Sequence, residues 1–224
     1  MTMMDISFDL LYERCLYSSL AHAVYVFREP FFSFEQSWDG QNYSFCDGST
    51  RGTISFRASS RIASGAARDD LSSRRSWYPQ KQALALFSSA PEENRSLARS
   101  ETLEYLYDTV EGTVCPVATV AMWHDGSRLF LSDEEPVFVR HGGRFLLLLS
   151  DPSVDLAAYW EQQYSLSADE MLLIDELRKF VHSDTPFELP TQFAKRIGKA
   201  QGLDEGLTSL QELGIAVRMK QPLF

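Results

Sequence analysis

The stretch from Phe31 to Phe56 constrains the fold of this chain most strongly, because it contains three short aromatic-rich runs separated by two glycine turns. Asp39-Gly40 between two such runs is typical of a two-residue hairpin turn, whose central residues both need positive φ. With that turn, Phe34 is predicted to lie opposite Phe45, on a shared aromatic face. The sequence therefore predicts an antiparallel meander with one aromatic face buried.

The second turn, residues 47–52, leads into the alternating run Thr53–Phe56, which is predicted to be the third strand. The opposite face of the meander is polar. We expect it to be a solvated surface, as is common for antiparallel sheets, with a binding surface as the alternative. Its residues are Ser33, Glu35, Ser37, Asn42, Ser44, Cys46, Thr53, Ser55 and Arg57.

Further strands and helices are predicted on both sides of the meander. Apolar residues at helical spacing predict a helix from Asp5 to Phe27, which Pro30 ends and which would cover the aromatic face. Residues 57–80 are predicted to be a polar loop with one short strand at 61–64, and their conformation is left open. A buried strand is expected at 114–123 and a strand at 128–131 after a turn, followed by a second hairpin formed by 137–139 and 145–149.

The last third of the chain is predicted to be helical. Ser167 and Glu170 have the spacing of a capping box, in which each side chain satisfies a free backbone donor of the other residue. A short helix is also expected from Thr191 to Ile197, and a further helix from Leu203 to Leu213. The order of elements predicts an α+β fold, with residues 1–150 as the sheet-containing core and residues 151–224 as a helical region packed on it in one structural unit.

The net charge argues against one class of function, and the cysteines and the first residues favour one compartment. The formal net charge is −10, which argues against general nucleic-acid binding, where a basic stripe is expected. Three scattered cysteines without CxxC spacing suit a reducing compartment. The first residues lack the basic start of a signal peptide, and no run is long and apolar enough to span a membrane. We therefore expect a cytoplasmic protein that does not bind membranes.

No motif with a strong catalytic mechanism occurs in the sequence. Phosphate loops, dinucleotide fingerprints, zinc-protease helices and nucleophile elbows are all missing, and the four histidines are widely separated. We therefore expect no metal ion and no cofactor. A nucleophilic pair of Cys46 or Cys115 with His124 or His141 is formally available, but nothing nearby in the sequence would lower a thiol pKa. Catalysis is not expected.

Two charged segments are candidate binding sites. Residues 51–100 carry nine basic and four acidic residues, and their arginines could hold a phosphate or carboxylate through their planar donors. The candidate anion-binding residues are Arg57, Arg61, Arg68, Arg74 and Arg75. The other segment is an acidic loop that a basic partner would contact. The candidate partner-binding residues are Asp133, Glu134, Glu135, Trp123 and His124. In both cases ordinary solvated surface charge is the alternative.

The leading hypothesis is a non-enzymatic, acidic protein-binding module. An acidic domain with charged loops, many aromatics and no catalytic motif is similar in profile to small bacterial immunity proteins. That resemblance implies a toxin as the protein partner, neutralised when its active site is covered. The alternative hypothesis is an enzyme or small-ligand binder that uses the arginine-rich segment to hold an anionic group.

Overall fold

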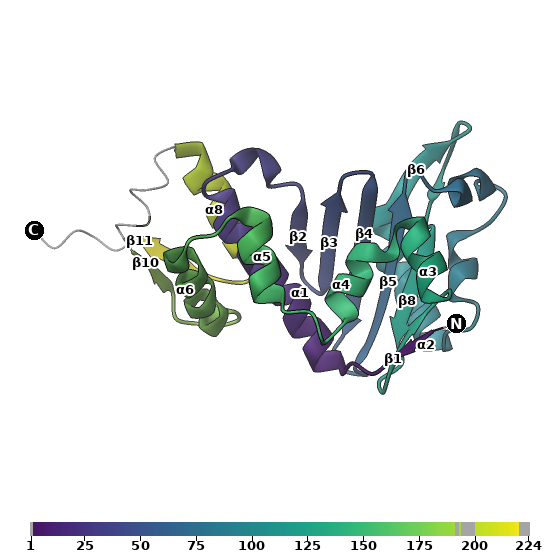
Figure 1. Cartoon of the computed structure of the whole chain (residues 1–224), viewed down its shortest axis with the longest axis horizontal. Helices are drawn as coiled ribbons and strands as arrows, with labels where there is room; N and C mark the ends of the chain where they lie inside the picture. Colours follow the sequence, from purple (N-terminus) through teal and green to yellow (C-terminus); the bar gives the residue numbers. More distant parts are fainter. Residues whose placement is uncertain (1, 191–192, 194–199, 220–224) are drawn as a thin grey trace, which may run out of the picture. The chain divides into compact units, whose positions relative to one another are not determined.

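The computed structural model describes residues 2–190, 193 and 200–219, and its main feature is a seven-stranded antiparallel sheet (Figure 1). The strand order is β1-β9-β8-β5-β4-β3-β2. The strands are β1 (Met3–Met4), β2 (Gln36–Asp39), β3 (Asn42–Asp47), β4 (Thr50–Arg57), β5 (Ile62–Asp69), β8 (Val120–His124) and β9 (Leu129–Leu131). The pairs β6 (Tyr107–Val110) with β7 (Thr113–Pro116) and β10 (Phe187–Leu189) with β11 (Val217–Met219) form separate two-stranded sheets.

Helices flank the sheet and dominate the last third, which confirms the predicted α+β class. They are α1 (Phe8–Val26), α2 (Glu92–Ser100), α3 (Glu135–Phe138), α4 (Arg144–Ser150), α5 (Leu156–Tyr164), α6 (Ala168–Leu177) and α8 (Ala200–Glu212). The predicted N-terminal helix is α1. The predicted capping box opens α6, since Ser167 accepts from the Glu170 N–H and the Glu170 carboxylate accepts from the Ser167 N–H. Apart from Phe193, the helix predicted at 191–197 lies outside the described residues.

The meander forms as predicted at β3 and β4, and its first strand is present beside β3 but is shortened to β2, which begins at Gln36. Gly48 turns the chain with φ +58°, and Tyr43 pairs with Ile54. The pairing predicted between Phe34 and Phe45 is wrong, because Phe34 precedes β2 and its segment forms a 3-10 turn instead. In that turn the N–H groups of Phe32, Ser33 and Glu35 donate to carbonyls three residues earlier, so they cannot pair with a strand.

The segment 57–80, predicted to be a polar loop with one short strand at 61–64, contains the longer strand β5. β5 runs over eight residues and pairs with β4 on one side and β8 on the other. Its centre consists of small residues that are almost fully buried, such as Ala66 and Ala67. A Cβ added to Gly65 would lie 2.9 Å from the Cε atom of Met122, its partner on β8, so side chains of the neighbouring strands already fill the space above this position. The small, polar composition of β5 therefore reflects close packing.

One face of the sheet is covered by apolar side chains from helices. The ring of Phe56 makes edge-on contacts with Phe8 and Tyr12 of α1, at centroid distances of 5.8 and 5.2 Å. Phe45 of β3 stacks on Phe145 of α4 at 4.2 Å. The predicted cover of the meander's aromatic face by the N-terminal helix is thus confirmed for Phe56, whereas Phe45 is covered by α4.

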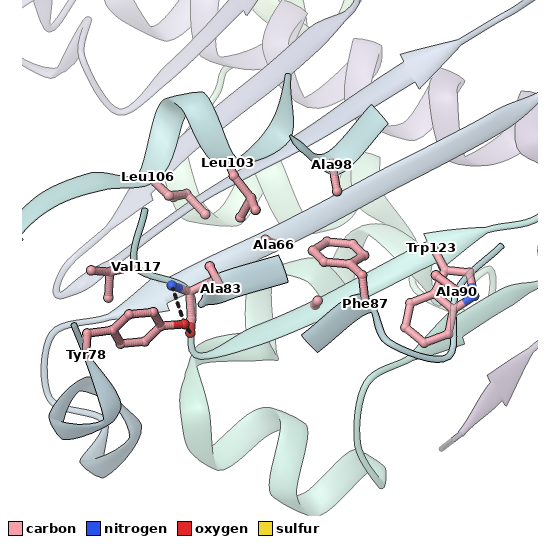
Figure 2. Packing of buried hydrophobic residues seen from close by; sticks show 12 residues of the cluster. Ala66, Tyr78, Ala83, Phe87, Ala90, Ala98, Leu103, Leu106, Val117 and Trp123 are labelled. Carbon is pink, nitrogen blue, oxygen red and sulfur yellow. Dashed lines mark hydrogen bonds between the residues drawn. The ribbon is translucent and has the colours of Figure 1, made fainter. Parts of the chain in front are cut away.

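The opposite face is also buried, which corrects the prediction of a solvated surface for its central residues. Thr53 and Ser55 are inaccessible, and the Thr102 hydroxyl lies 3.0 Å from the Ser55 hydroxyl. Next to them, Trp123 packs in an apolar cluster with Phe87 and Leu103 (Figure 2). In the same cluster Tyr78 donates its hydroxyl proton to the Ala118 carbonyl at 2.6 Å. Of the nine residues predicted for the polar face, Asn42, Thr53 and Ser55 are therefore interior, and the other six are partly exposed.

The two hairpins predicted after residue 114 have different outcomes. The strand–turn–strand arrangement exists as β8 and β9, although residues 113–116 form the separate strand β7. The hairpin predicted from 137–139 and 145–149 is wrong, because α3 and α4 occupy this stretch on either side of a π-helical turn at Val139–Gly143. An unbroken apolar run has no alternation to distinguish a strand from a helix, and Pro136 in the first turn of α3 favours the helix.

The chain divides into two compact units, which are described separately. The first contains residues 1–14 and 41–154, and the second contains residues 15–40 and 155–224. Residues 15–40, which sequence reasoning placed with the sheet-containing core, are thus grouped with the C-terminal helices. Among the described residues, none of the helices combines the length and apolar character needed to cross a membrane.

Candidate functional site

Two of the candidate anion-binding arginines share two aspartates. Arg68 lies 3.1 Å from Asp70 and 3.3 Å from Asp108. Arg75 donates to the same two carboxylates at 2.8 and 2.5 Å. Two guanidinium groups and two carboxylates therefore neutralise each other in this cluster, and an incoming anion would have to displace an aspartate from it.

Arg74 is a buried structural cation. Its two terminal nitrogens donate to the two oxygens of Asp133 at 2.8 and 2.6 Å, and one of them also donates to the Thr119 carbonyl at 2.8 Å. The guanidinium holds the pKa of Asp133 below its usual range, although partial burial of that carboxyl acts in the opposite direction. The bidentate geometry ties the segment after β5 to the loop after β9.

The remaining two arginines lie elsewhere. Arg61 pairs with Asp9 at 2.7 Å, and both side chains are more than half exposed. Arg57 is half-buried at the end of β4. The structure therefore does not collect the five arginines into one clamp. Anion binding by them stays a prediction, with four of the five already paired to carboxylates.

The candidate partner-binding residues are also separated by the fold. Trp123 and His124 are 2% and 0% exposed in β8, where they present no side-chain surface to a partner. Glu134 and Glu135 are exposed at the start of α3, while Asp133 is held by Arg74. A contact with a partner on this segment is thus limited to the two glutamates.

The histidines of the candidate nucleophilic pairs contact structural partners. His141 Nδ1 lies 2.9 Å from the Ser72 hydroxyl, and His124 Nε2 lies 3.0 Å from the Ile6 carbonyl. Cys46 and Cys115 are half-buried free thiols. Within the part of the chain that the structure describes, no cluster of three His, Cys, Asp or Glu side chains is suited to hold a metal ion.

The most unusual surface in the second unit is the segment Glu29–Gln36, here called the aromatic turn, which connects α1 to β2 (Figure 1). It contains the 3-10 helix η1 (Pro30–Phe32). Phe31 and Phe34 are 77% and 68% exposed, and Phe32 is 38% exposed. Three large apolar side chains within four consecutive positions therefore face solvent. Single exposed apolar residues are normal, whereas a cluster of exposed aromatics is a candidate contact surface.

A buried polar network holds the aromatic turn in place. Gln36 Nε2 donates to the Tyr164 hydroxyl at 2.9 Å, and this hydroxyl lies 3.1 Å from His22 Nδ1. In the neutral tautomer of His22 that is protonated at Nε2, Nδ1 accepts the proton of the Tyr164 hydroxyl. Burial lowers the pKa of His22 to about 4, which agrees with a neutral ring.

Aromatic stacking extends this support to the phenylalanines. The rings of Tyr25 and Tyr164 are stacked at a centroid distance of 4.2 Å, and Tyr25 lies 5.8 Å from Phe32. Arg28 donates to the Tyr164 carbonyl and pairs with Glu170 at 3.3 Å. The turn therefore rests on side chains of α1, α5 and α6 that are fixed by packing and hydrogen bonds.

The surroundings of the aromatic turn are acidic. Glu29 and Glu35 lie at its two ends, half-buried, and Asp39 follows at the end of β2. Partial burial raises the pKa of Tyr25, and the negative charges of Glu29 and Glu35 raise it further. The two glutamates thus supply acidic groups at this surface, while the neighbouring cation Arg28 pairs with Glu170 and acts on Tyr25 in the opposite direction.

Sequence reasoning missed the aromatic turn because it assigned these phenylalanines to a buried strand. Pro30 was the residue in the sequence that indicated a turn at this position. Proline fixes φ near −65° and favours the start of a turn, so a run that follows it directly is a weak strand candidate. No protein-family model, curated protein or solved structure matches the chain. The function is therefore argued from the site itself.

Proposed function

We propose that this chain is a non-enzymatic protein-binding module that holds a basic protein partner through the aromatic turn. The observation that supports it is the exposure of Phe31 and Phe34 on a segment supported by a buried network. In the immunity-type version of the proposal, the partner is a toxin acting in the cytoplasm and binding covers its active site.

The phenylalanines suit the role of anchors. Large aromatic side chains supply most of the energy in many interfaces, and fully burying one phenylalanine contributes about 1.5–3 kcal/mol. Because Gln36, Tyr164 and Tyr25 already fix the backbone and the neighbouring rings, little conformational entropy is lost when a partner binds. Preorganised anchors of this kind favour a slow dissociation rate.

The acidic surroundings define the chemistry of the partner. Glu29 and Glu35 flank the anchors, and the chain as a whole carries a net charge of −10. Complementary charge accelerates association and disfavours acidic competitors. A protein whose active site binds a polyanionic or phosphorylated substrate is basic at that site, so it fits this surface.

The alternative, a binder of small anions that uses the arginine-rich segment, receives less support from the geometry. Arg68, Arg74 and Arg75 already have carboxylate partners at 2.5–3.3 Å. Their charges are therefore compensated within the fold, and they are distributed over more than one cluster.

The proposal is tested by co-expressing the tagged chain with each protein encoded beside its gene and measuring which of them co-purifies. We expect one neighbour to bind the wild type and to lose binding to the double variant Phe31→Ser/Phe34→Ser. Leu172→Ser is the matched control. Leu172 is an apolar residue of similar exposure, 63%, on α6 of the same unit, and it lies outside the aromatic turn. Absence of any binding neighbour, or a neighbour that binds the double variant as well as the wild type, would overturn the proposal.

A further inference from the structure

A pocket of about 500 Å³ lies in the first unit, between the β6–β7 hairpin and the short helices that precede it. Ligand pockets in proteins commonly span about 300–1,000 Å³. Its lining comes from the start of η3 (Ala83–Phe87), the end of α2, the helix η4 (Thr102–Leu106) and both hairpin strands. Neither the aromatic turn nor the arginine-rich clusters contribute to it.

The floor of the pocket is apolar. Ala83 and Leu103, both labelled in Figure 2, belong to the buried cluster behind the pocket. Leu84 packs against that cluster and also lines the pocket, together with Pro79 and Pro116. This floor would accommodate a flat aromatic or aliphatic group and would exclude water from it.

The rim of the pocket carries two cations, Lys81 and Arg99, which are both exposed. Lys81 Nζ lies 3.9 Å from the centre of the Trp77 ring. In the part of the chain that the structure describes, neither cation forms an ion pair, in contrast to six arginines that do: Arg28, Arg61, Arg68, Arg74, Arg75 and Arg95. Two cations without an ion pair, above an apolar floor, suit an amphipathic anion.

Glu104 reduces the positive charge of the rim. Its carboxylate lies on the same rim, so the three charged groups at the pocket sum to +1. This excess attracts an anion, and a single carboxylate neutralises it. A monocarboxylate therefore matches the charge of the rim.

We infer that this pocket is a binding site for a small monocarboxylate with an aromatic or aliphatic body, held by Lys81 and Arg99. The body lies on the floor formed by Ala83, Leu84 and Leu103, and the carboxylate lies at the rim. This inference is independent of the proposed protein-binding function, since it uses different residues of the other unit.

The rate at which Cys115 is alkylated can report whether a ligand occupies the pocket. Its thiol is half-buried and lines the pocket, whereas Cys46 is a half-buried thiol on β3 and is no part of the lining. The experiment measures the rate at which iodoacetamide alkylates each cysteine of the full chain, by mass spectrometry of peptides. The probes are 2-naphthoate and its neutral analogue 2-naphthamide.

A ligand of this size is expected to bind with a Kd on the order of 1 mM. At about 10 mM, 2-naphthoate is therefore expected to slow alkylation of Cys115 roughly tenfold, while the rate at Cys46 is unchanged. The variant Arg99→Gln is expected to lose most of this protection, and Arg51→Gln, which replaces an exposed arginine on β4, is expected to keep it.

Three results of the Cys115 measurement would overturn the inference, and a fourth comes from the comparison with Cys46. They are no protection of Cys115 by naphthoate, equal protection by naphthamide, or protection that persists in Arg99→Gln. Equal slowing at Cys46 and Cys115 would also contradict it, because the effect would then come from the bulk solution and not from the pocket.

Discussion

His22 is buried beneath the aromatic turn with its imidazole neutral, and this has a consequence for stability. Burial lowers its pKa from 6.5 to about 4. Between these values the unfolded chain binds a proton at His22 that the folded chain does not bind. The free energy of unfolding is therefore fully retained above pH 6.5 and decreases as the pH falls toward 4. The loss amounts to about 1.4 kcal/mol for each pH unit within the window.

The variant His22→Gln removes this proton linkage, because glutamine does not titrate and its amide can still accept from Tyr164. We expect the free energy of unfolding of the wild type to fall between pH 6.5 and pH 5 by roughly 2 kcal/mol more than that of the variant. Urea denaturation at a series of pH values measures both. Parallel curves for the two proteins would show that His22 titrates normally in the folded chain.

The buried ion pair of Arg74 with Asp133 is expected to contribute to the stability of the fold. Arg74→Met leaves the half-buried carboxylate of Asp133 without its bidentate partner, and we expect a destabilisation of about 2–3 kcal/mol. The matched control is Arg61→Met, which removes the exposed pair with Asp9 and should cost less than about 0.5 kcal/mol. Equal effects of the two variants in thermal or chemical unfolding would contradict a structural role for Arg74.

At the scale of elements, the pairing of β3 with β4 depends on a close approach at Gly52. A Cβ atom added there would lie 2.3 Å from the Phe45 Cζ atom, because the phenylalanine ring crosses over the glycine. We expect Gly52→Val to destabilise the protein by about 1–3 kcal/mol through overpacking. The second substitution Phe45→Leu should recover part of that loss. No recovery in the double variant would mean that another contact limits this position.

The elements that sequence reasoning predicted correctly are those with an unambiguous local signal. Gly48 with its positive φ, the capping box at Ser167 and the spacing of apolar residues in α1 each determine structure within a few residues. The errors fall where tertiary packing decides. The apolar run 145–149 has no period of its own, and the small residues of β5 are strand-forming only because both faces of the sheet are covered.

The candidate site was harder to predict than the fold, and for a physical reason. The arginines after β4 were singled out by their density, but whether a charge is available for a ligand depends on the carboxylates that the fold brings to it, such as Asp108 and Asp133. Conversely, the hairpin register predicted from the turn at Asp39-Gly40 assigned Phe34 to the interior. Only the backbone shows that Pro30 opens a turn that leaves Phe31 and Phe34 in solvent.

At the scale of the whole molecule, the acidic charge and the aromatic turn predict different kinetic effects. Replacing the flanking acids in Glu29→Gln/Glu35→Gln should slow association with a basic partner and weaken its dependence on salt. The dissociation rate should change little. Association rates measured between about 0.05 and 0.5 M salt test this, since screening shortens the range of the field. An unchanged salt dependence in the variant would locate the attraction elsewhere on the chain.

The central claim is that Phe31 and Phe34 anchor a protein partner. The most direct test is the dissociation rate of the complex with the neighbour-encoded partner, measured for the wild type, Phe31→Ser/Phe34→Ser and Leu172→Ser. The account predicts that the double variant dissociates at least about 100-fold faster, equivalent to ~2.7 kcal/mol, and that the Leu172 control matches the wild type. A double variant that dissociates at the wild-type rate would contradict the account.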